Sequence, residues 1–159
     1  MSLKLSPVLD VPELTARVAR AAFPKGNPYL RLRDELGPVF RDADFAELYP
    51  RRGQPALPPW KLALITVMQF AEDLSDRQAA DAVRGRIDWK YALGLELDDP
   101  GFHFSALSDF RGRLVVGGAE RLLLDQSSRS ARTAACSRPG PAGALTRPTS
   151  WLPLVTSTA

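Results

Sequence analysis

The stretch between residues 59 and 116 constrains the fold of this chain most, because four helix patterns follow one another there with only short turns between them. The predicted helices are Trp60–Leu74, Asp76–Arg84, Trp89–Leu93 and 106–116. The first of them is apolar on nearly all sides, which is typical of a helix buried at the centre of a domain. No segment shows the period-two alternation of a strand. The sequence therefore predicts an all-α, multi-helix domain with a helix-turn-helix-like core at residues 59–116.

Capping residues predict where these core helices begin and end. Ser75 and Gln78 have the spacing of a capping box, in which each side chain bonds the backbone of the other residue. Asp88 and Ser105 each precede a helical pattern and are expected to cap it. The pair of glycines that starts at Gly117 is expected to end the last helix.

The amino-terminal part of the chain shows the same kind of signals. Asp10 and Glu13 have capping-box spacing and predict a helix that ends before the Pro- and Gly-rich segment 23–28. Asn27 is expected to cap a second helix that ends at Gly37. A short helix is predicted at 42–49. These helices complete a predicted domain at residues 1–125.

The basic character of the chain belongs to its tail. Residues 126–159 contain four Arg and no acid, whereas residues 1–125 contain 17 Lys and Arg against 18 Asp and Glu. A case for nucleic-acid binding must therefore rest on local patches of the domain. The tail is rich in Ser, Thr, Pro, Gly and Ala, buries too little apolar surface to fold, and is predicted to be disordered.

Other features of the sequence indicate the cellular compartment of the chain. The one cysteine, Cys136, lies in the tail, so no internal disulfide is possible and nothing suggests export. The amino terminus lacks the apolar run of a signal peptide. The longest apolar run, Leu62 to Met68, is far shorter than the roughly 20 residues that span a bilayer. We expect a cytoplasmic chain without a membrane partner.

Several motifs carry a resemblance to a known family. They are Phe23–Tyr29 (FPKGNPY), Gln69–Glu72, Leu74–Ala80, Ile87–Tyr91 and Phe104–Arg111. Together they resemble the amino-terminal domain of bacterial insertion-sequence transposases, in the InsH-like group of the DDE class. The resemblance covers roughly residues 5 to 125. His103 departs from it, because an acidic residue is expected at that position.

The resemblance implies a role in DNA transposition, a recombination reaction. It implies that this domain binds the terminal inverted repeats of the element. The family's RNase H-like domain carries Asp, Asp and Glu that hold a divalent metal such as Mg²⁺, but none of these catalytic carboxylates matches a residue here. We therefore expect a truncated transposase that is not itself an enzyme and needs no cofactor. Its expected partners are DNA and either a second copy or the intact transposase.

The tail offers a hypothesis for this truncation. The family has a catalytic Asp in a stretch resembling Asp-Ser-Thr-His-Val-Leu-Ala-Ala-Val just beyond this domain. Codons for Leu145–Leu154 of this chain permit that stretch when they are read one frame away. The tail is thus interpreted as a shifted-frame translation of the catalytic region. The nucleotide sequence of the gene tests this hypothesis directly.

Basic residues on the second, third and fourth core helices are the candidates for DNA contact. They are Arg77, Arg84, Arg86, Lys90 and Arg111. Such side chains can bind phosphates or read guanine edges. The alternative is a solvated face on which they pair with Asp76, Asp81 and Asp88. Arg113 is a weaker candidate, because Asp109 stands one turn before it.

Two further groups are assigned structural roles. The aromatic residues are expected in the core rather than on a base-stacking platform. They are Trp60, Phe70, Trp89, Tyr91 and Phe110. The acids Glu72, Asp73 and Asp76 are attributed to helix-dipole effects rather than to a metal site. Two other interpretations stay open. The chain could be a helical dimerisation module, or it could be the nonfunctional product of a decayed gene.

Overall fold

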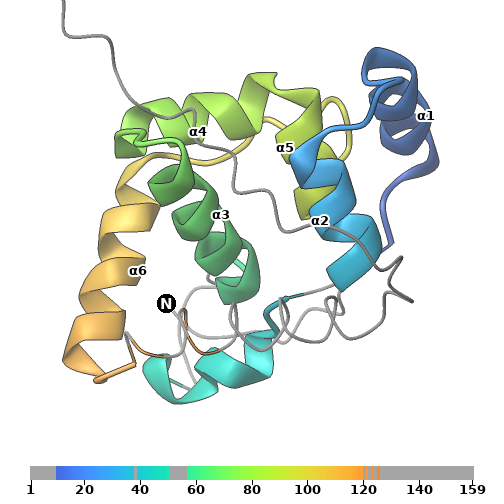
Figure 1. Ribbon diagram of the computed structural model, residues 1–159. Helices are drawn as coiled ribbons and strands as arrows, with labels where there is room; N and C mark the ends of the chain where they lie inside the picture. Colours follow the sequence, from blue (N-terminus) through green and yellow to red (C-terminus); the bar gives the residue numbers. More distant parts are fainter. Residues whose placement is uncertain are drawn as a thin grey trace, which may run out of the picture.

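The computed structural model describes residues 10–37, 39–50 and 57–119, together with 121, 123 and 125. Seven helices and no strands occur in this described part, which confirms the all-α prediction (Figure 1). The helices are α1 Glu13–Ala22, α2 Pro28–Leu36, η1 Asp42–Leu48, α3 Pro59–Ala71, α4 Asp76–Gly85, α5 Ile87–Leu93 and α6 Ser105–Val116. The predicted disordered tail, residues 126–159, lies outside the described residues.

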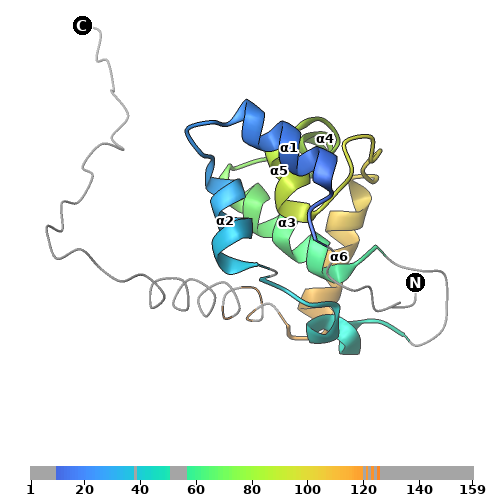
Figure 2. The ribbon, with the colours of Figure 1, turned by 90° about the vertical axis from the view of Figure 1, so that its right-hand side faces the viewer.

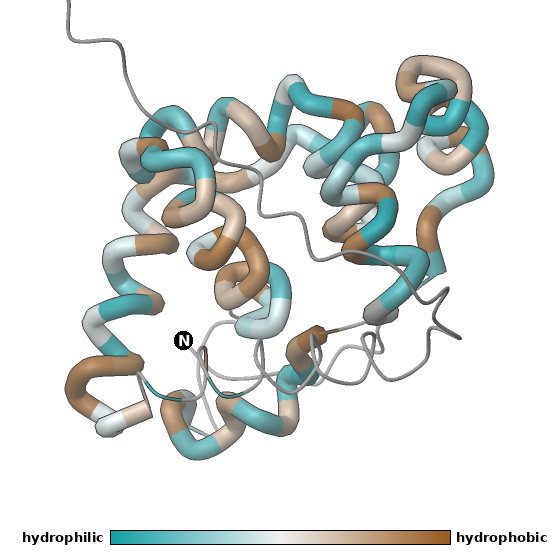
Figure 3. Tube along the Cα trace, viewed as in Figure 1, coloured by the Kyte–Doolittle hydropathy of each residue, from teal (hydrophilic) through white to brown (hydrophobic). Residues whose placement is uncertain are grey.

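Helix α3 is the centre of the domain. It contacts η1, α4 and α6, and most of its residues are buried. Figure 3 shows hydrophobic segments along α3 and α6. The helix ends at Ala71, three residues before the predicted end. Asp73 adopts a left-handed backbone with φ of 54°, and the backbone N–H of Leu74 turns back to donate to the carbonyl of Gln69.

A second packing unit joins the amino-terminal helices to α5. Helix α5 contacts both α1 and α2 (Figure 2). Ala19, Leu30 and Tyr91 form a small buried cluster between these three helices. The hydroxyl of Thr15 donates to the carbonyl of Leu95 over 2.8 Å in a buried position. Helix α5 therefore links the amino-terminal half of the domain to the α3 core.

Some predicted caps are confirmed. The side chain of Asn27 accepts from the backbone N–H of Tyr29 over 2.8 Å, and Pro28 occupies the first turn of α2. Ser75 and Gln78 form the predicted capping box at the start of α4. The sequence thus placed the starts of these two helices correctly.

Three predicted caps are wrong. Helix α1 begins at Glu13 with Pro12 as its cap, so the carboxylate of Asp10 lies too early in the chain to cap it. Asp88 lies inside α5, and its carboxylate faces Arg86, which is the cap residue of that helix. Ser105 is the first residue of α6, with Phe104 as its cap, and the Ser105 hydroxyl bonds Nδ1 of His103 over 2.9 Å.

The short helix at 42–49 is a 3₁₀ helix rather than an α-helix. It is tied to the core because Oδ1 of Asp42 accepts from the backbone N–H of Trp60 over 3.2 Å. Phe45 of the same segment packs edge-on against Phe110 of α6, with ring centroids 5.7 Å apart. This contact closes the lower end of the core beneath α3 and α6.

Four of the five predicted core aromatics are confirmed. Trp60, Trp89, Tyr91 and Phe110 are at most 2% exposed. Phe70 is 90% exposed, so its assignment to the core is wrong. It is the last residue but one of α3 and lines a surface hollow with Asp76 and Arg111. None of the described helices has the length and apolarity to span a bilayer.

Candidate nucleic-acid interface

Two of the five predicted DNA contacts lie exposed on α4. Arg77 and Arg84 are separated by seven residues, so they lie on the same face of the helix, roughly 10 Å apart along its axis. Ala79, Ala80 and Val83 of the same helix are buried against the core. Helix α4 is thus anchored by small residues and presents these two guanidinium groups outward.

Among the described residues, Arg77 has one local contact and Arg84 has two, because Nε of Arg84 also donates to the carbonyl of Pro100 over 3.1 Å. The guanidinium carbon of Arg77 lies 4.9 Å from the ring centroid of Phe104. Arg84 pairs with Asp81 over 3.1 Å, and their side chains are 55% and 64% exposed. An ion pair this open to water contributes little stability and can be exchanged for another anion.

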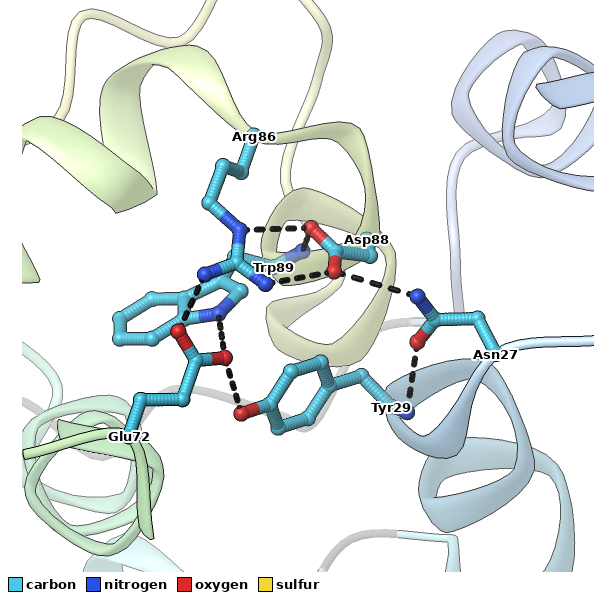
Figure 4. A network of polar contacts seen from close by, with 6 residues as sticks. All are labelled: Asn27, Tyr29, Glu72, Arg86, Asp88 and Trp89. Atoms are coloured by element: carbon cyan, nitrogen blue, oxygen red, sulfur yellow. Dashed lines mark hydrogen bonds and ion pairs between the residues drawn. The ribbon is translucent and has the colours of Figure 1, made fainter. Parts of the chain in front are cut away.

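Arg86 lies inside a polar network instead (Figure 4). Its guanidinium pairs with Glu72 and, over 2.8 Å, with Asp88. These hydrogen bonds, first that to Asp88, raise the pKa of Arg86 above its usual value. The guanidinium also lies 5.3 Å from the ring centroid of Trp89. Its charge is therefore balanced by two carboxylates of the domain.

The same network joins α2, α3 and α5. Glu72 also accepts from the hydroxyl of Tyr29 and, over 3.3 Å, from the indole N–H of Trp89. Asn27 donates to Asp88 over 3.2 Å. The bond from Arg86 is the main reason that the pKa of Glu72 is lowered. The pKa of Tyr29 is raised, mainly by burial and then by its bond to Glu72.

Lys90 is buried, with 3% of its surface exposed. Its ammonium group donates to the carbonyl of Glu96 over 3.3 Å and to that of Asp99 over 2.7 Å. These bonds fasten the loop after α5 to the helix. The side chain therefore turns into the protein, away from any ligand at the surface.

Arg111 forms a two-pronged pair with Asp76 across α6 and α4. The two nitrogen–oxygen distances are 2.8 and 2.6 Å, and this pairing is the main cause of the lowered pKa of Asp76. Gln69 of α3 donates to the same carboxylate over 2.8 Å. Asp76 thus connects the three helices α3, α4 and α6.

Arg113 does not pair with Asp109 among the described residues; its guanidinium carbon lies 5.0 Å from the ring centroid of Tyr49. The acidic residues Glu72 and Asp76 each face an arginine, as described above. In the described part of the chain, no group of three or more His, Cys, Asp or Glu residues is placed to hold a metal ion.

The sequence did not reveal the central position of Glu72. In the sequence Glu72 stands among other acids at a helix end, where a dipole effect is a sufficient explanation. Its partners Tyr29 and Arg86 are 43 and 14 residues away in the chain. Only the packing of α2, α3 and α5 brings them together. Tyr29, Glu72 and Asp88 lie in three separate segments of the sequence.

The described residues form a small helical domain with two exposed arginines on α4. Residues 17–113 match the protein family described as transposase domain (DUF772), and this match covers more than half of the chain. The chain therefore belongs to this transposase-domain family. No curated protein and no solved structure matched it. The family assignment agrees with the resemblance inferred from the motifs.

Proposed function

We propose that this domain binds duplex DNA, with the terminal inverted repeats of a transposable element as its specific target. The observation that carries the proposal is the pair of exposed arginines on α4 in a chain of the transposase-domain family. Helix α4 is fixed to the core on one side and offers Arg77 and Arg84 on the other. A separation of roughly 10 Å lets the two side chains reach different phosphates.

The remaining predicted contacts receive positioning roles in this proposal. Arg86 and Arg111 hold α5 and α6 against their neighbours through carboxylates of the domain. Lys90 holds the loop after α5. We therefore assign phosphate contact to Arg77 and Arg84, and we expect substitutions of the other three to act through stability.

Fluorescence anisotropy with a labelled terminal-repeat duplex tests the proposal. The double substitution Arg77→Ala and Arg84→Ala should weaken binding about tenfold or more, and it should lower the slope of log affinity against log salt by about 0.9 for each lost contact. Arg17→Ala with Arg31→Ala removes the same charge from exposed positions on α1 and α2 and should leave the slope unchanged. Equal effects of the two double variants would reject the α4 surface as the contact.

We further propose that the chain binds DNA without cutting it. The hypothesis that Leu145–Leu154 is an out-of-frame reading supports this, because the codons permit a stretch with a catalytic Asp of the family in another frame. An Asp-Ser-Thr-His stretch in the shifted frame of the gene is the expected finding. Strand cleavage by the purified chain in the presence of Mg²⁺ would contradict the proposal.

A second candidate function is self-association. Phe70 and Val116 are 90% and 91% exposed, and apolar surface of this kind is common where two chains meet. Light scattering of the chain without DNA distinguishes the two functions. A dimer that binds no DNA at low salt would favour the interaction module over the DNA-binding domain.

A further inference from the structure

We propose that α6 is the helix that enters the major groove, while α4 lies across the phosphate backbone. This inference rests on the proposed DNA binding and deepens it, because it assigns base reading and phosphate contact to different helices. Three features of the structure lead to it: the way α3, α4 and α6 pack, the side chains on the outer face of α6, and the cations at its two ends.

The packing of three helices resembles a helix-turn-helix arrangement, although they are not consecutive. Helices α3, α4 and α6 all contact one another, whereas α5 packs against α1, α2 and α4. Figure 1 shows α6 at the outer edge of the domain. In helix-turn-helix proteins, one helix crosses the backbone and the next lies in the groove. Here α4 and α6 take these positions, and α5 with its loop stands between them in the sequence.

The outer face of α6 carries groups that can read base edges. Leu107, Phe110 and Leu114 are buried on the inner face of the helix. The opposite face exposes Ser105, Ser108, Asp109 and Gly112. Serine hydroxyls bond to several bases, and a carboxylate accepts from the amino group of cytosine. A Cβ atom at Gly112 would meet nothing within 4 Å, although Glu47 and Leu48 of η1 line the same hollow as Ser108 and Gly112.

Cations stand at both ends of this face. Arg77 lies over Phe104, directly before α6, and Arg113 lies near the end of the helix. Nine residues of helix separate Phe104 from Arg113, or roughly 13 Å. The major groove is about 12 Å wide, with phosphates along both sides. When α6 lies in this groove its axis follows the groove, so the two guanidinium groups can contact phosphates at different points along it.

The polar character of the exposed groups favours DNA over a second copy of the chain as the occupant of this face. Apolar exposure is confined to the carboxyl-terminal end, where Val115 and Val116 are 64% and 91% exposed. The first two turns expose hydroxyl and carboxylate groups, which a protein interface would have to desolvate. In a groove these groups face bases that offer hydrogen-bonding partners.

A bulky substitution on α6 tests the inference in the full chain. Gly112→Glu adds volume and negative charge at an open position, and it replaces glycine with a better helix former, so the fold should be kept. Binding to the terminal-repeat duplex should weaken about tenfold or more. Ala21→Glu makes a similar change at an exposed position on α1 and should bind like the unmodified chain.

A sequence-preference measurement provides a second readout. In this measurement, the protein selects duplexes from a pool in which positions of the repeat are randomised. The double variant Ser108→Ala with Asp109→Ala should differ from the unmodified chain in the bases it prefers at a few adjacent base pairs. The salt dependence should stay near that of the unmodified chain, because no phosphate contact is removed. If the double variant lost affinity equally for every sequence and kept the base preference of the unmodified chain, base reading by α6 would be wrong.

The other outcomes separate this inference from the proposed function. If the unmodified chain binds the duplex and Gly112→Glu binds equally well, α6 is excluded while DNA binding stands. If the unmodified chain binds no duplex at low salt, both fail. If light scattering shows that Gly112→Glu converts a dimer to a monomer that still reads the same sequence, the face is an interface between copies and the inference is wrong.

Discussion

Removal of the Glu72 carboxylate should destabilise the domain strongly. In Glu72→Ala, Arg86 loses one of its two carboxylate partners, and the hydroxyl of Tyr29 and the indole N–H of Trp89 lose their acceptor. A hydrogen bond to a charged group contributes about 1.5–3 kcal/mol and a neutral one about 1 kcal/mol. The Glu72 side chain is 26% exposed, so water replaces part of this loss. We expect the free energy of unfolding to fall by about 2–4 kcal/mol.

Urea unfolding followed by tryptophan fluorescence measures this change. Asp81→Ala is the matched control, because it removes one carboxylate from an exposed ion pair and should cost less than about 0.5 kcal/mol. In a double-mutant cycle, Tyr29→Phe should lower the free energy of unfolding less in the Glu72→Ala background than in the unmodified chain. A loss for Glu72→Ala no larger than that for Asp81→Ala would refute the role of this network in joining α2, α3 and α5.

Other perturbations follow from the same contacts. Asp76→Asn should lower the free energy of unfolding by about 1–3 kcal/mol in chemical denaturation, because it weakens the bonds from Arg111 and Gln69. The folded-state pKa values of Glu72 and Asp76 are lowered, so their contribution is complete above the unfolded values of about 4 and is lost as the pH falls through the folded values. Thermal melts should therefore show falling stability below about pH 4, and less of this fall in Asp76→Asn. Leu107→Ala should cost about 2–5 kcal/mol in a urea titration, since Leu107 is fully buried. Phe70→Ser should change the urea midpoint little, because the ring is 90% exposed.

The sequence predicted those parts of the fold that local chemistry determines. The cap at Asn27 and the capping box at Ser75 and Gln78 need only a few neighbouring residues, and both were confirmed. The caps predicted at Asp88 and Ser105 failed because tertiary or nearby partners bind those side chains in other ways. Capping rules describe an isolated helix end, and they lose to a charged partner such as Arg86.

The candidate site was harder to predict, because exposure depends on packing. Lys90 and Arg84 are equally basic in the sequence, yet Lys90 is buried against carbonyl groups and Arg84 is open to solvent. Helical periodicity alone could not separate them, since both lie in helices whose buried faces depend on partners from other segments. Likewise, the pairing of Arg111 with Asp76 spans 35 residues and becomes apparent only when α4 and α6 pack together.

An NMR titration of the isotopically labelled chain with the terminal-repeat duplex tests the central claim most directly. DNA binding through the proposed surface predicts amide shift changes concentrated in α4 and in residues 103–113, with α1 and α2 largely unchanged. A spectrum without changes at low salt would contradict DNA binding by this domain. Shift changes confined to α1 and α2 would show that the DNA contacts another surface and would contradict binding through α4 and α6.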